Sequence, residues 1–244
     1  SGRNSLYFNT TGSENVAVGQ QALLNNTTGS SSTSVGYQAA YTNTTGQNEA
    51  FGYQAAYSNT TGNYNQAFGY QALNSNTTGS YNIAIGRGAV QLNTTGSNNV
   101  GVGFQALVAN TTASDNTAVG YQALLSNTTG TANTAIGKRA LQDSTTGGDN
   151  TAVGVSAMLE NTTGSSNSAF GVLAMDDNTT GDTNTALGAS ALRRNTTASY
   201  NTAVGYQAAF SNTTASFNTS VGYQSLYTIT TNGSNTALGY QAGY

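Results

Sequence analysis

The sequence predicts an all-β protein, a parallel β-solenoid of roughly 14 coils with about 17 residues each, and three observations support this prediction. A glycine recurs along the chain at a nearly constant step of about 17 residues, and such a fixed period is the signature of a repeat architecture. Each step contains two turn signals, Gly-Ser and Asn-Thr-Thr, with short apolar segments between them. A helical repeat would need about 33 residues for a helix pair, so one solenoid winding per step fits better.

The repeated glycine defines the register of the repeat. Only the step from Gly36 to Gly52 is one residue shorter, and the missing residue lies between Gly46 and Asn48, so we expect that turn to tolerate a deletion. With the glycine placed in column 5, the consensus reads N-T-A-V-G-Y-Q-A-L-x-x-N-T-T-G-S-x. The glycines are Gly2, Gly19, Gly36, Gly52, Gly69, Gly86, Gly103, Gly120, Gly137, Gly154, Gly171, Gly188, Gly205, Gly222 and Gly239.

Four columns predict the interior of the coil. Column 4 is apolar in every full copy, as at Val18 and Phe51, and column 9 is mostly aliphatic, as at Leu23 and Met158. We therefore expect columns 4 and 9 to stack into two apolar ladders that close the core. Columns 3 and 8 are almost all Ala, which lets opposing walls of the coil approach closely.

Columns 5 and 1 predict special backbone or polar roles. The column-5 glycine indicates a bend or a close approach between backbones. Column 1 is Asn in 13 of 14 copies, with Ser32 as the exception. Its asparagines either form an inward amide ladder that bonds coil to coil or serve as turn residues that tolerate positive φ.

The composition argues against several classes of function. Charged residues make up 6 % of the chain, against about 25 % in ordinary globular domains. The net charge of −3 argues against a nucleic-acid partner, and no apolar run is long enough for membrane insertion. The chain has no His for acid–base chemistry and no Cys nucleophile. We therefore predict no enzyme activity, no catalytic residue, no cofactor and no metal site.

The charged middle stretch holds the one catalytic alternative. Glu160 and Asp177 share column 11 in neighbouring coils, about 5 Å apart at the backbone, a separation that retaining glycosidases use between carboxylates. No pocket-forming pattern surrounds them. We therefore interpret the stretch from Lys138 to Arg194, which holds most of the charge, as a solvated face, with a local contact patch as the alternative.

The repeats resemble two families of surface fibres. The segments Asn116–Leu124 and Asn15–Leu23 resemble the head repeats of YadA-type trimeric autotransporter adhesins, although the adhesin repeat is shorter. They are still more similar to the T-T-G-S-x-N-T-A-V-G-Y-Q-A-L arrays of phage and giant-virus tail-fibre-type proteins. The resemblance covers every coil and implies a left-handed parallel β-roll, often trimeric, on a surface-exposed fibre.

Asn-Thr-Thr also matches the N-glycosylation sequon. If the sequons are used, a row of glycans about one coil apart follows the stack; the alternative is turn chemistry in which Thr hydroxyls bond backbone. The Thr pair persists where Asn is lost, at Ser144 and Ile229, which favours the alternative. Outside this column, Asn25, Asn218 and Asn232 also match. The candidate N-glycosylation sites in column 12 are Asn9, Asn26, Asn43, Asn59, Asn76, Asn93, Asn110, Asn127, Asn161, Asn178, Asn195 and Asn212.

Aromatic residues gather in columns 6 and 10, which we expect to lie on the outside. They predict a subunit interface or a carbohydrate-stacking surface, and the plainer alternative is stacking of neighbouring rings along one face. Column 10 contains Tyr7, Tyr41, Tyr57, Phe210, Tyr227 and Tyr244, and column 6 also contains Phe104. The candidate interface residues in column 6 are Tyr37, Tyr53, Tyr70, Tyr121, Tyr206, Tyr223 and Tyr240.

These patterns predict a structural component of an extracellular, cell-surface or virion fibre. Both ends fall within a repeat and carry no polar cap, so we expect one solenoid over residues 1–244 that self-associates as a head-to-tail fibril or a homotrimer. The second hypothesis is an adhesin or receptor-binding rod that grips glycans through its tyrosines. The third is an ice-binding surface, with one rank of column-13 or column-14 Thr facing outward beside the column-12 asparagines.

Overall fold

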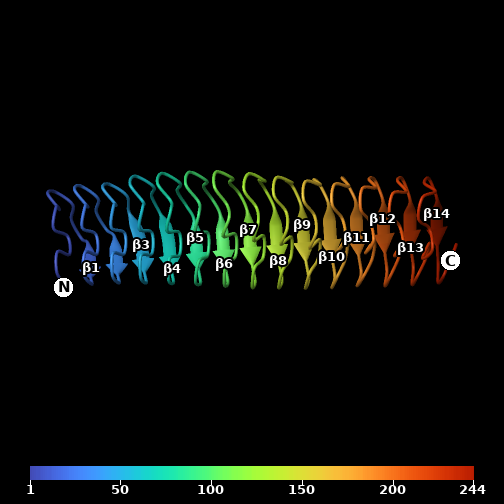
Figure 1. Ribbon diagram of the computed structural model, residues 1–244, viewed down its shortest axis with the longest axis horizontal. Coiled ribbons are helices and arrows are strands. Elements are labelled where there is room, and N and C mark those ends of the chain that lie inside the picture. Colours follow the sequence, from blue (N-terminus) through green and yellow to red (C-terminus); the bar gives the residue numbers. More distant parts are fainter. The chain divides into compact units, whose positions relative to one another are not determined.

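The computed structural model describes every residue from Ser1 to Tyr244, and its contacts divide the chain into two compact units, Ser1–Val119 and Gly120–Tyr244. All regular elements are short β-strands, one per repeat (Figure 1). The first unit contains β1 (Val16–Val18), β2 (Thr33–Val35), β3 (Asn48–Phe51), β4 (Asn65–Phe68), β5 (Ile83–Ile85), β6 (Val100–Val102) and β7 (Thr117–Val119). The second contains β8 (Thr134–Ile136), β9 (Thr151–Val153), β10 (Ser168–Phe170), β11 (Thr185–Leu187), β12 (Thr202–Val204), β13 (Thr219–Val221) and β14 (Thr236–Leu238).

Neighbouring strands within each unit pair in parallel and in chain order. Ala67 of β4 lies opposite Ala50 of β3 and Ala84 of β5, and Ala169 of β10 lies opposite Ala186 of β11 in the same way. Each column therefore stacks on its own copy in the next coil. This register confirms the predicted parallel β-solenoid with 17 residues per coil. The handedness of the winding and the continuity of the two units as one domain stay predictions.

Each coil bends at residues in the left-handed backbone region. Gln71 in column 7 has a φ of 52° and Leu73 in column 9 a φ of 51°, an uncommon conformation for residues other than Gly. The Gln71 N–H donates to the Tyr53 carbonyl of the preceding coil at 2.9 Å, whereas the Leu73 N–H donates to the Ala89 carbonyl of the following coil at 3.0 Å. The two bends thus direct the amides of columns 7 and 9 to opposite neighbouring coils, and these hydrogen bonds stabilise the strained conformation.

The shortened coil lacks one such bend. Column 17 is left-handed in the other coils, with a φ of 58° at Tyr64 and 59° at Tyr81. In the shortened coil, Gln47 takes column 16, and its carbonyl accepts the Tyr64 N–H at 2.6 Å before the chain passes directly to Asn48. The coil therefore closes without column 17, which explains why this turn accommodates a deletion.

The column-5 glycine is required by both conformation and space. Gly69 has a φ of 143°, and a Cβ atom there would lie 2.5 Å from the carbonyl oxygen of Gly86 in the next coil. A contact that short would push the two coils apart. The predicted close approach between backbones is confirmed.

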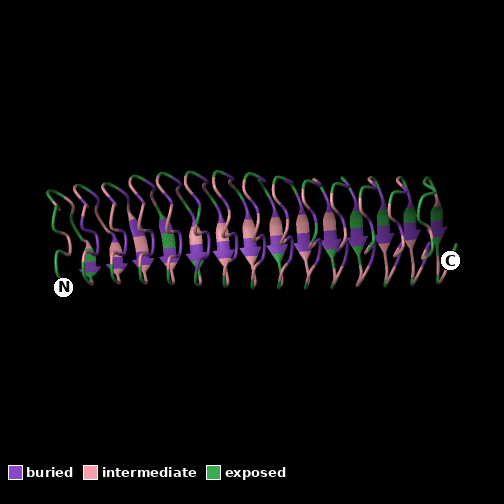
Figure 2. Cartoon of the chain, in the orientation of Figure 1, coloured by how far each residue is buried: buried purple, intermediate pink, exposed green.

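The interior is thin and lined by alanine. Ala67 in column 3, Ala72 in column 8 and Leu73 in column 9 have no exposed surface, and their counterparts in the other coils repeat this pattern almost throughout. Figure 2 shows the resulting buried strip on the strands of both units. The predicted apolar ladder in column 9 and the small residues in columns 3 and 8 are confirmed.

The prediction that column 4 closes the core is wrong. Ile85 keeps 42 % of its surface exposed and Leu187 keeps 50 %. Columns 3 and 4 are consecutive residues of one strand, so their side chains point to opposite faces of the sheet. With the column-3 Ala inside, column 4 forms an apolar rank on the outer surface.

Asparagines occupy the rest of the interior in two ladders. In column 1, Asn65 Oδ1 accepts the backbone N–H of Asn82 in the next coil at 3.0 Å, and Asn65 Nδ2 donates to the Gly79 carbonyl at 2.9 Å. In column 12, Asn76 Nδ2 donates to Asn59 Oδ1 at 2.7 Å and to the same Gly79 carbonyl at 2.9 Å. The column-1 residues have negative φ. The amide-ladder interpretation is therefore confirmed, and the second ladder in column 12 was not predicted.

Candidate interaction surface

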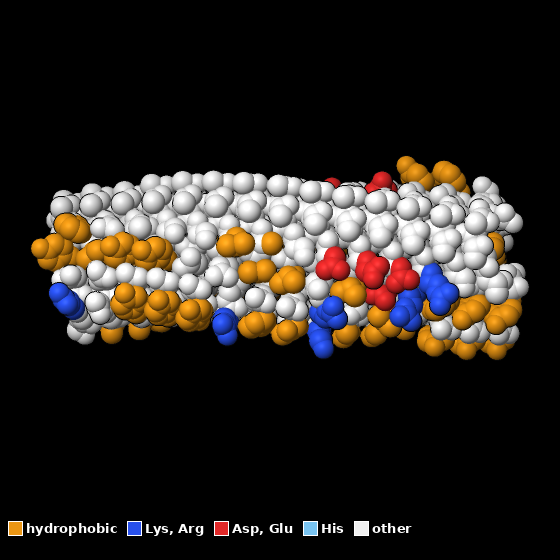
Figure 3. All heavy atoms as spheres, in the orientation of Figure 1, with side chains coloured by type: hydrophobic (Ala, Val, Ile, Leu, Met, Phe, Trp, Pro, Cys, Tyr) orange, Lys and Arg blue, Asp and Glu red, His pale blue; other side chains and the backbone are white.

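The outer stripe of each unit is formed by columns 4 and 6, on either side of the column-5 glycine. Column 4 contributes aliphatic side chains and the stacked pair Phe51–Phe68, whose ring centroids lie 4.9 Å apart. The candidate interface tyrosines of column 6 are all exposed, as predicted, from 40 % at Tyr37 to 73 % at Tyr240. Figure 3 shows hydrophobic side chains gathered in rows on the surface. We call these two columns the apolar stripe.

The column-6 tyrosines stack on one another from coil to coil. Tyr53 lies between Tyr37 and Tyr70, with ring centroids 5.3 and 5.1 Å away and nearly parallel planes. The second unit repeats this arrangement with centroid separations of 5.5 and 5.2 Å in the series Tyr206, Tyr223 and Tyr240. The predicted stacking along one face is therefore present, while their role as an interface stays a prediction.

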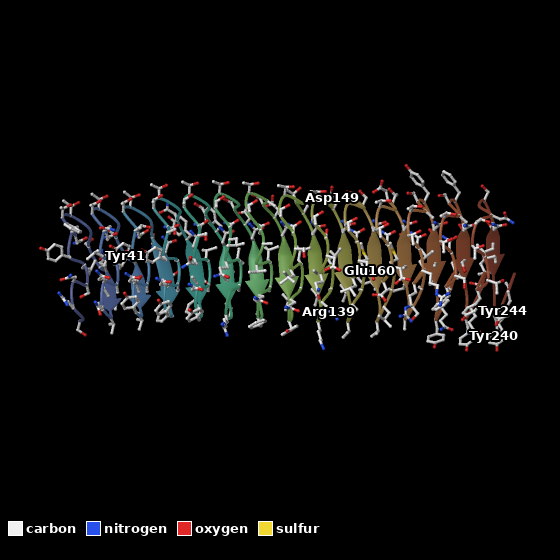
Figure 4. All side chains as sticks on the ribbon, in the orientation of Figure 1. Tyr41, Arg139, Asp149, Glu160, Tyr240 and Tyr244 are labelled. Carbon is white, nitrogen blue, oxygen red and sulfur yellow. The ribbon has the colours of Figure 1, made fainter.

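Two further aromatic ranks lie outside the stripe. Column 10 contains the stacked pairs Tyr41–Tyr57 and Tyr227–Tyr244, and Figure 4 shows Tyr240 and Tyr244 projecting from the last coil. Burial raises the pKa of the Tyr57 phenol, and the neighbouring Tyr41 and Tyr37 phenols raise it further. The third rank lies in column 17 and was not predicted, although the 17-residue spacing of its aromatic residues is visible in the sequence. That rank contains the stacked pairs Tyr64–Tyr81 and Tyr200–Phe217.

A glutamine ladder runs beside the tyrosines in column 7 and is interrupted at Gly88 and again from Arg139 to Ser190. Gln54 Nε2 donates to Gln38 Oε1 at 2.9 Å, and Gln71 Nε2 donates to Gln54 Oε1 at 3.1 Å. The next coil has Gly88 in this column, and Gln91 from column 10 reaches across to donate to Gln71 Oε1 at 3.1 Å. Removal of one side chain from the ladder leaves a depression in the surface.

The depression has a volume of about 160 Å³ and combines aromatic, amide and cationic groups. Tyr70, Arg87 and Phe104 border it from column 6, and Gln71 and Gln105 border it from column 7. The Arg87 guanidinium carbon lies 5.4 Å from the centroid of the Tyr70 ring. Arg87 makes no salt bridge, since the structure contains only the pair formed by Arg193 and Asp176.

The sequon asparagines of column 12 point into the coil. Asn26 and every later member of the candidate set have no exposed surface, and their side-chain nitrogens donate within the coil stack, as Asn26 does to the Gly29 carbonyl and to Asn9 Oδ1. Asn9 in the first coil is half-buried and donates to the Gly12 carbonyl at 2.9 Å. Because a glycan needs the same nitrogen and open space around it, glycosylation of the buried members is incompatible with this packing. Among the sequons outside the column, Asn218 is also buried and Asn232 is exposed.

The paired threonines have separate environments. The column-13 hydroxyl bonds backbone, as where Thr77 Oγ1 donates to the Thr94 carbonyl at 2.9 Å, so the turn-chemistry interpretation is confirmed. Thr78 in column 14 is exposed, as are its counterparts in all 14 coils. The expectation that column-12 asparagines flank an outward Thr rank is wrong, because those asparagines are inside.

The charged cluster of the second unit contains one carboxyl group with an altered pKa. Asp176 in column 10 is buried, and its Oδ2 lies 3.5 Å from Arg193 Nε. Burial raises the pKa of Asp176 from 3.8 to about 6, Asp177 and Glu160 add to the increase, and Arg193 opposes it. Acidic and basic side chains lie together in Figure 3 over the coils from β9 to β12.

The charged cluster brings a third carboxylate, Asp176, beside Glu160 and Asp177. The side chain of Asp176 is packed beside Arg193, and the charges of Glu160 and Asp177 lie near it. No group of three or more His, Cys, Asp or Glu residues is arranged to hold a metal ion. None of the chain forms a long apolar helix of the kind that crosses a membrane. No protein-family model, curated protein or solved structure matches this chain.

Proposed function

We propose that this protein is a non-catalytic structural component of an extracellular or virion fibre, and that copies of the chain associate side by side through the apolar stripe. The observation that carries the proposal is column 4, which is apolar in all 14 coils although it lies on the outer surface. A column exposed only to water would not need that restriction. The resemblance of the repeats to surface-fibre proteins supports the location.

A second copy of this chain is the partner best matched to the stripe. Apolar side chains recur in column 4 at the spacing between adjacent strands, about 4.8 Å. Only a surface with the same repeat meets every member of such a row in the same way, and another copy has that surface. In the second unit the stripe contains one charged side chain, Lys138 in column 6. Association through the stripe therefore removes little charge from water.

The oligomeric state of a stripe variant tests the proposal. Phe51→Thr, Phe68→Thr and Ile85→Thr together remove apolar area from column 4 and place β-branched threonines there, which suit a strand. Analytical ultracentrifugation of the wild-type protein should show assemblies at multiples of the 24.8 kDa chain mass. The triple variant should dissociate about 100-fold more readily, because each lost contact weakens association by about 1 kcal/mol.

A matched control replaces exposed apolar residues of the same unit outside the stripe. Tyr64→Thr, Tyr81→Thr and Leu92→Thr remove side chains that are 52, 58 and 48 % exposed. This control should assemble like the wild-type protein. A wild-type protein that remains a monomer at all concentrations, or equal effects of both triple variants, would overturn the proposal. If electron micrographs show filaments or bundles of the wild-type protein and none of the stripe variant, the same association also builds fibres.

A second candidate function is glycan binding, and the depression at Gly88 favours it. Aromatic faces at Tyr70 and Phe104, amides at Gln71 and Gln91, and the unpaired Arg87 cation are groups that bind the apolar face, hydroxyls and carboxylate of an acidic sugar. Gly88→Gln restores the consensus ladder and fills the depression. A glycan array should show binding of uronate-containing glycans by the wild-type protein and its loss in Gly88→Gln. Unchanged binding by the filled variant would exclude this site.

A further inference from the structure

Tyrosines of neighbouring coils form a set of parallel pairs on the surface. Seven stacked pairs involve 12 of the 15 tyrosines, with ring centroids 5.1 to 5.5 Å apart. The pairs lie in columns 6, 10 and 17, so they arise on three separate ranks. They are Tyr37–Tyr53, Tyr53–Tyr70, Tyr41–Tyr57, Tyr64–Tyr81, Tyr206–Tyr223, Tyr223–Tyr240 and Tyr227–Tyr244.

The chain offers an oxidant few other targets. It has no Cys and no Trp. Its two sulfur atoms belong to Met158 and Met175, which have no exposed surface. Oxidation of Met and Cys follows exposure, so a one-electron oxidant in solution meets the exposed phenols first. Tyr64 and Tyr81, for example, are 52 and 58 % exposed.

We propose that the stacked tyrosine pairs are sites of oxidative cross-linking that joins adjacent coils by carbon–carbon bonds. Each phenol of a pair loses one electron and one proton to an oxidant of the peroxidase-and-peroxide class. The two phenoxyl radicals join through the ring carbons next to their oxygens. The protons on those carbons move to the oxygens, which restores both phenols. Two tyrosines thus yield one dityrosine, two protons and two electrons, and these reduce one hydrogen peroxide to two water molecules.

The coil register selects which tyrosines couple. The ring planes of Tyr41 and Tyr57 are 9° from parallel at a centroid separation of 5.1 Å, and side-chain rotation brings the two reacting carbons together from there. Each link closes a covalent loop of one coil, which constrains the unfolded chain as a disulfide does. The chain contains its own negative controls, since Tyr200–Phe217 and Phe210–Tyr227 stack in the same geometry but each has only one phenol.

Peptide mass spectrometry after treatment with a haem peroxidase and hydrogen peroxide tests the proposal. The protein is used dilute, so that links within one chain dominate, and an identical sample is oxidised in concentrated urea. Linked peptides, lighter than their sum by two hydrogen atoms, should come from the seven stacked pairs. Their yield should exceed that of the same pairs in urea by about 10-fold or more, because the folded coils hold the rings at a high effective concentration.

Two variants of the column-10 pair sharpen the test. Tyr57→Phe keeps the stack and should abolish only the link to Tyr41. Tyr57→Phe with Asn74→Tyr keeps 15 tyrosines but moves the second phenol one coil further away, and it should not restore a link to Tyr41. Equal yields in buffer and urea, or a link from Tyr41 to the relocated tyrosine as abundant as the native one, would overturn the proposal. The test does not depend on association between copies, so it stands or fails separately from the proposed function.

Discussion

At the scale of single residues, asparagine is the main polar group of the interior. A buried amide is costly unless its donors and acceptor are satisfied. In the coil around Gly79, the carbonyl of that glycine accepts from both Asn65 and Asn76, so one backbone oxygen joins the two ladders. The column-12 ladder is broken at Ser144, whose buried Oγ has no hydrogen-bond partner.

Ser144→Asn should therefore stabilise the protein. The new amide would donate to the Gly147 carbonyl, which now accepts only the Asn133 side chain of column 1. We expect the free energy of unfolding, measured in urea, to rise by about 1 kcal/mol for the hydrogen bonds gained. Ser126→Asn, in the half-buried column 11, serves as the control and should leave the stability unchanged. A loss of stability in Ser144→Asn would contradict the role assigned to the ladder.

Part of this interior could be predicted from residue types alone. The period, the Ala lining and one of two roles for column 1 followed from the repeat. The prediction for column 4 is wrong because apolar character alone does not distinguish a buried column from an apolar outer one. The alternation of side chains along a strand and the range of side-chain volumes in each column together indicate which of columns 3 and 4 faces the interior. Column 3 is restricted to small residues, as at Ala50, whereas column 4 ranges from Val18 to Phe51, and only an open surface accepts that range of volumes.

At the scale of elements, the coil depends on its bends as much as on its strands. Strands of three or four residues are joined by left-handed residues that the sequence does not mark with Gly or Asn, as at Leu73. Propensity could not predict them, because inter-coil hydrogen bonds rather than local preference hold them. The inward position of the column-12 asparagines could not be predicted either, because the sequence Asn-Thr-Thr is the same for a glycosylation sequon and for a buried asparagine.

The charged segment after β10 should make stability depend on pH. The folded pKa of Asp176 is raised to about 6, so between pH 4 and 6 the folded protein holds a proton that the unfolded chain releases. Stability contributed by this group is therefore fully present at low pH and is lost as pH rises through about 6. Asp176→Asn should stabilise the protein at pH 7 by about 1 kcal/mol, after allowance for solvent screening and the lost Arg193 pair.

Unfolding in urea at several pH values measures this effect. Asp176→Asn should flatten the fall in stability between pH 4 and 6. Asp149→Asn, on the exposed column 17, is the control and should keep the wild-type slope. If the wild-type protein gains stability across that range and the variant does not change it, Asp176 is not the responsible group.

At the scale of the whole molecule, stability is a sum over neighbouring coils. Each coil bonds only to the coils before and after it within its unit, as in other repeat proteins. Removing residues 205–221 joins Val204 to Gly222 and deletes one complete coil in register. This variant should unfold in one transition, with an m-value reduced in proportion to the surface lost.

An out-of-register deletion is the matched comparison. Removing residues 205–212 joins column 4 to column 13 and places Thr213 where the bend glycine belongs. Because a register error moves interior residues to the surface, circular dichroism should show loss of the β signal in the coils that follow. Equal stability of the two deletion variants would show that the register of the columns is not what holds the stack.

The direction of the backbone hydrogen bonds has a mechanical consequence. They run from coil to coil along each stack rather than across strands pulled in shear. Tension applied to a terminus therefore breaks the hydrogen bonds of one coil before those of the next coil are loaded, so the coils open one after another. Each opening releases the chain of a single coil, about 60 Å when extended. Under load such a unit yields in small equal steps and absorbs work repeatedly instead of rupturing once.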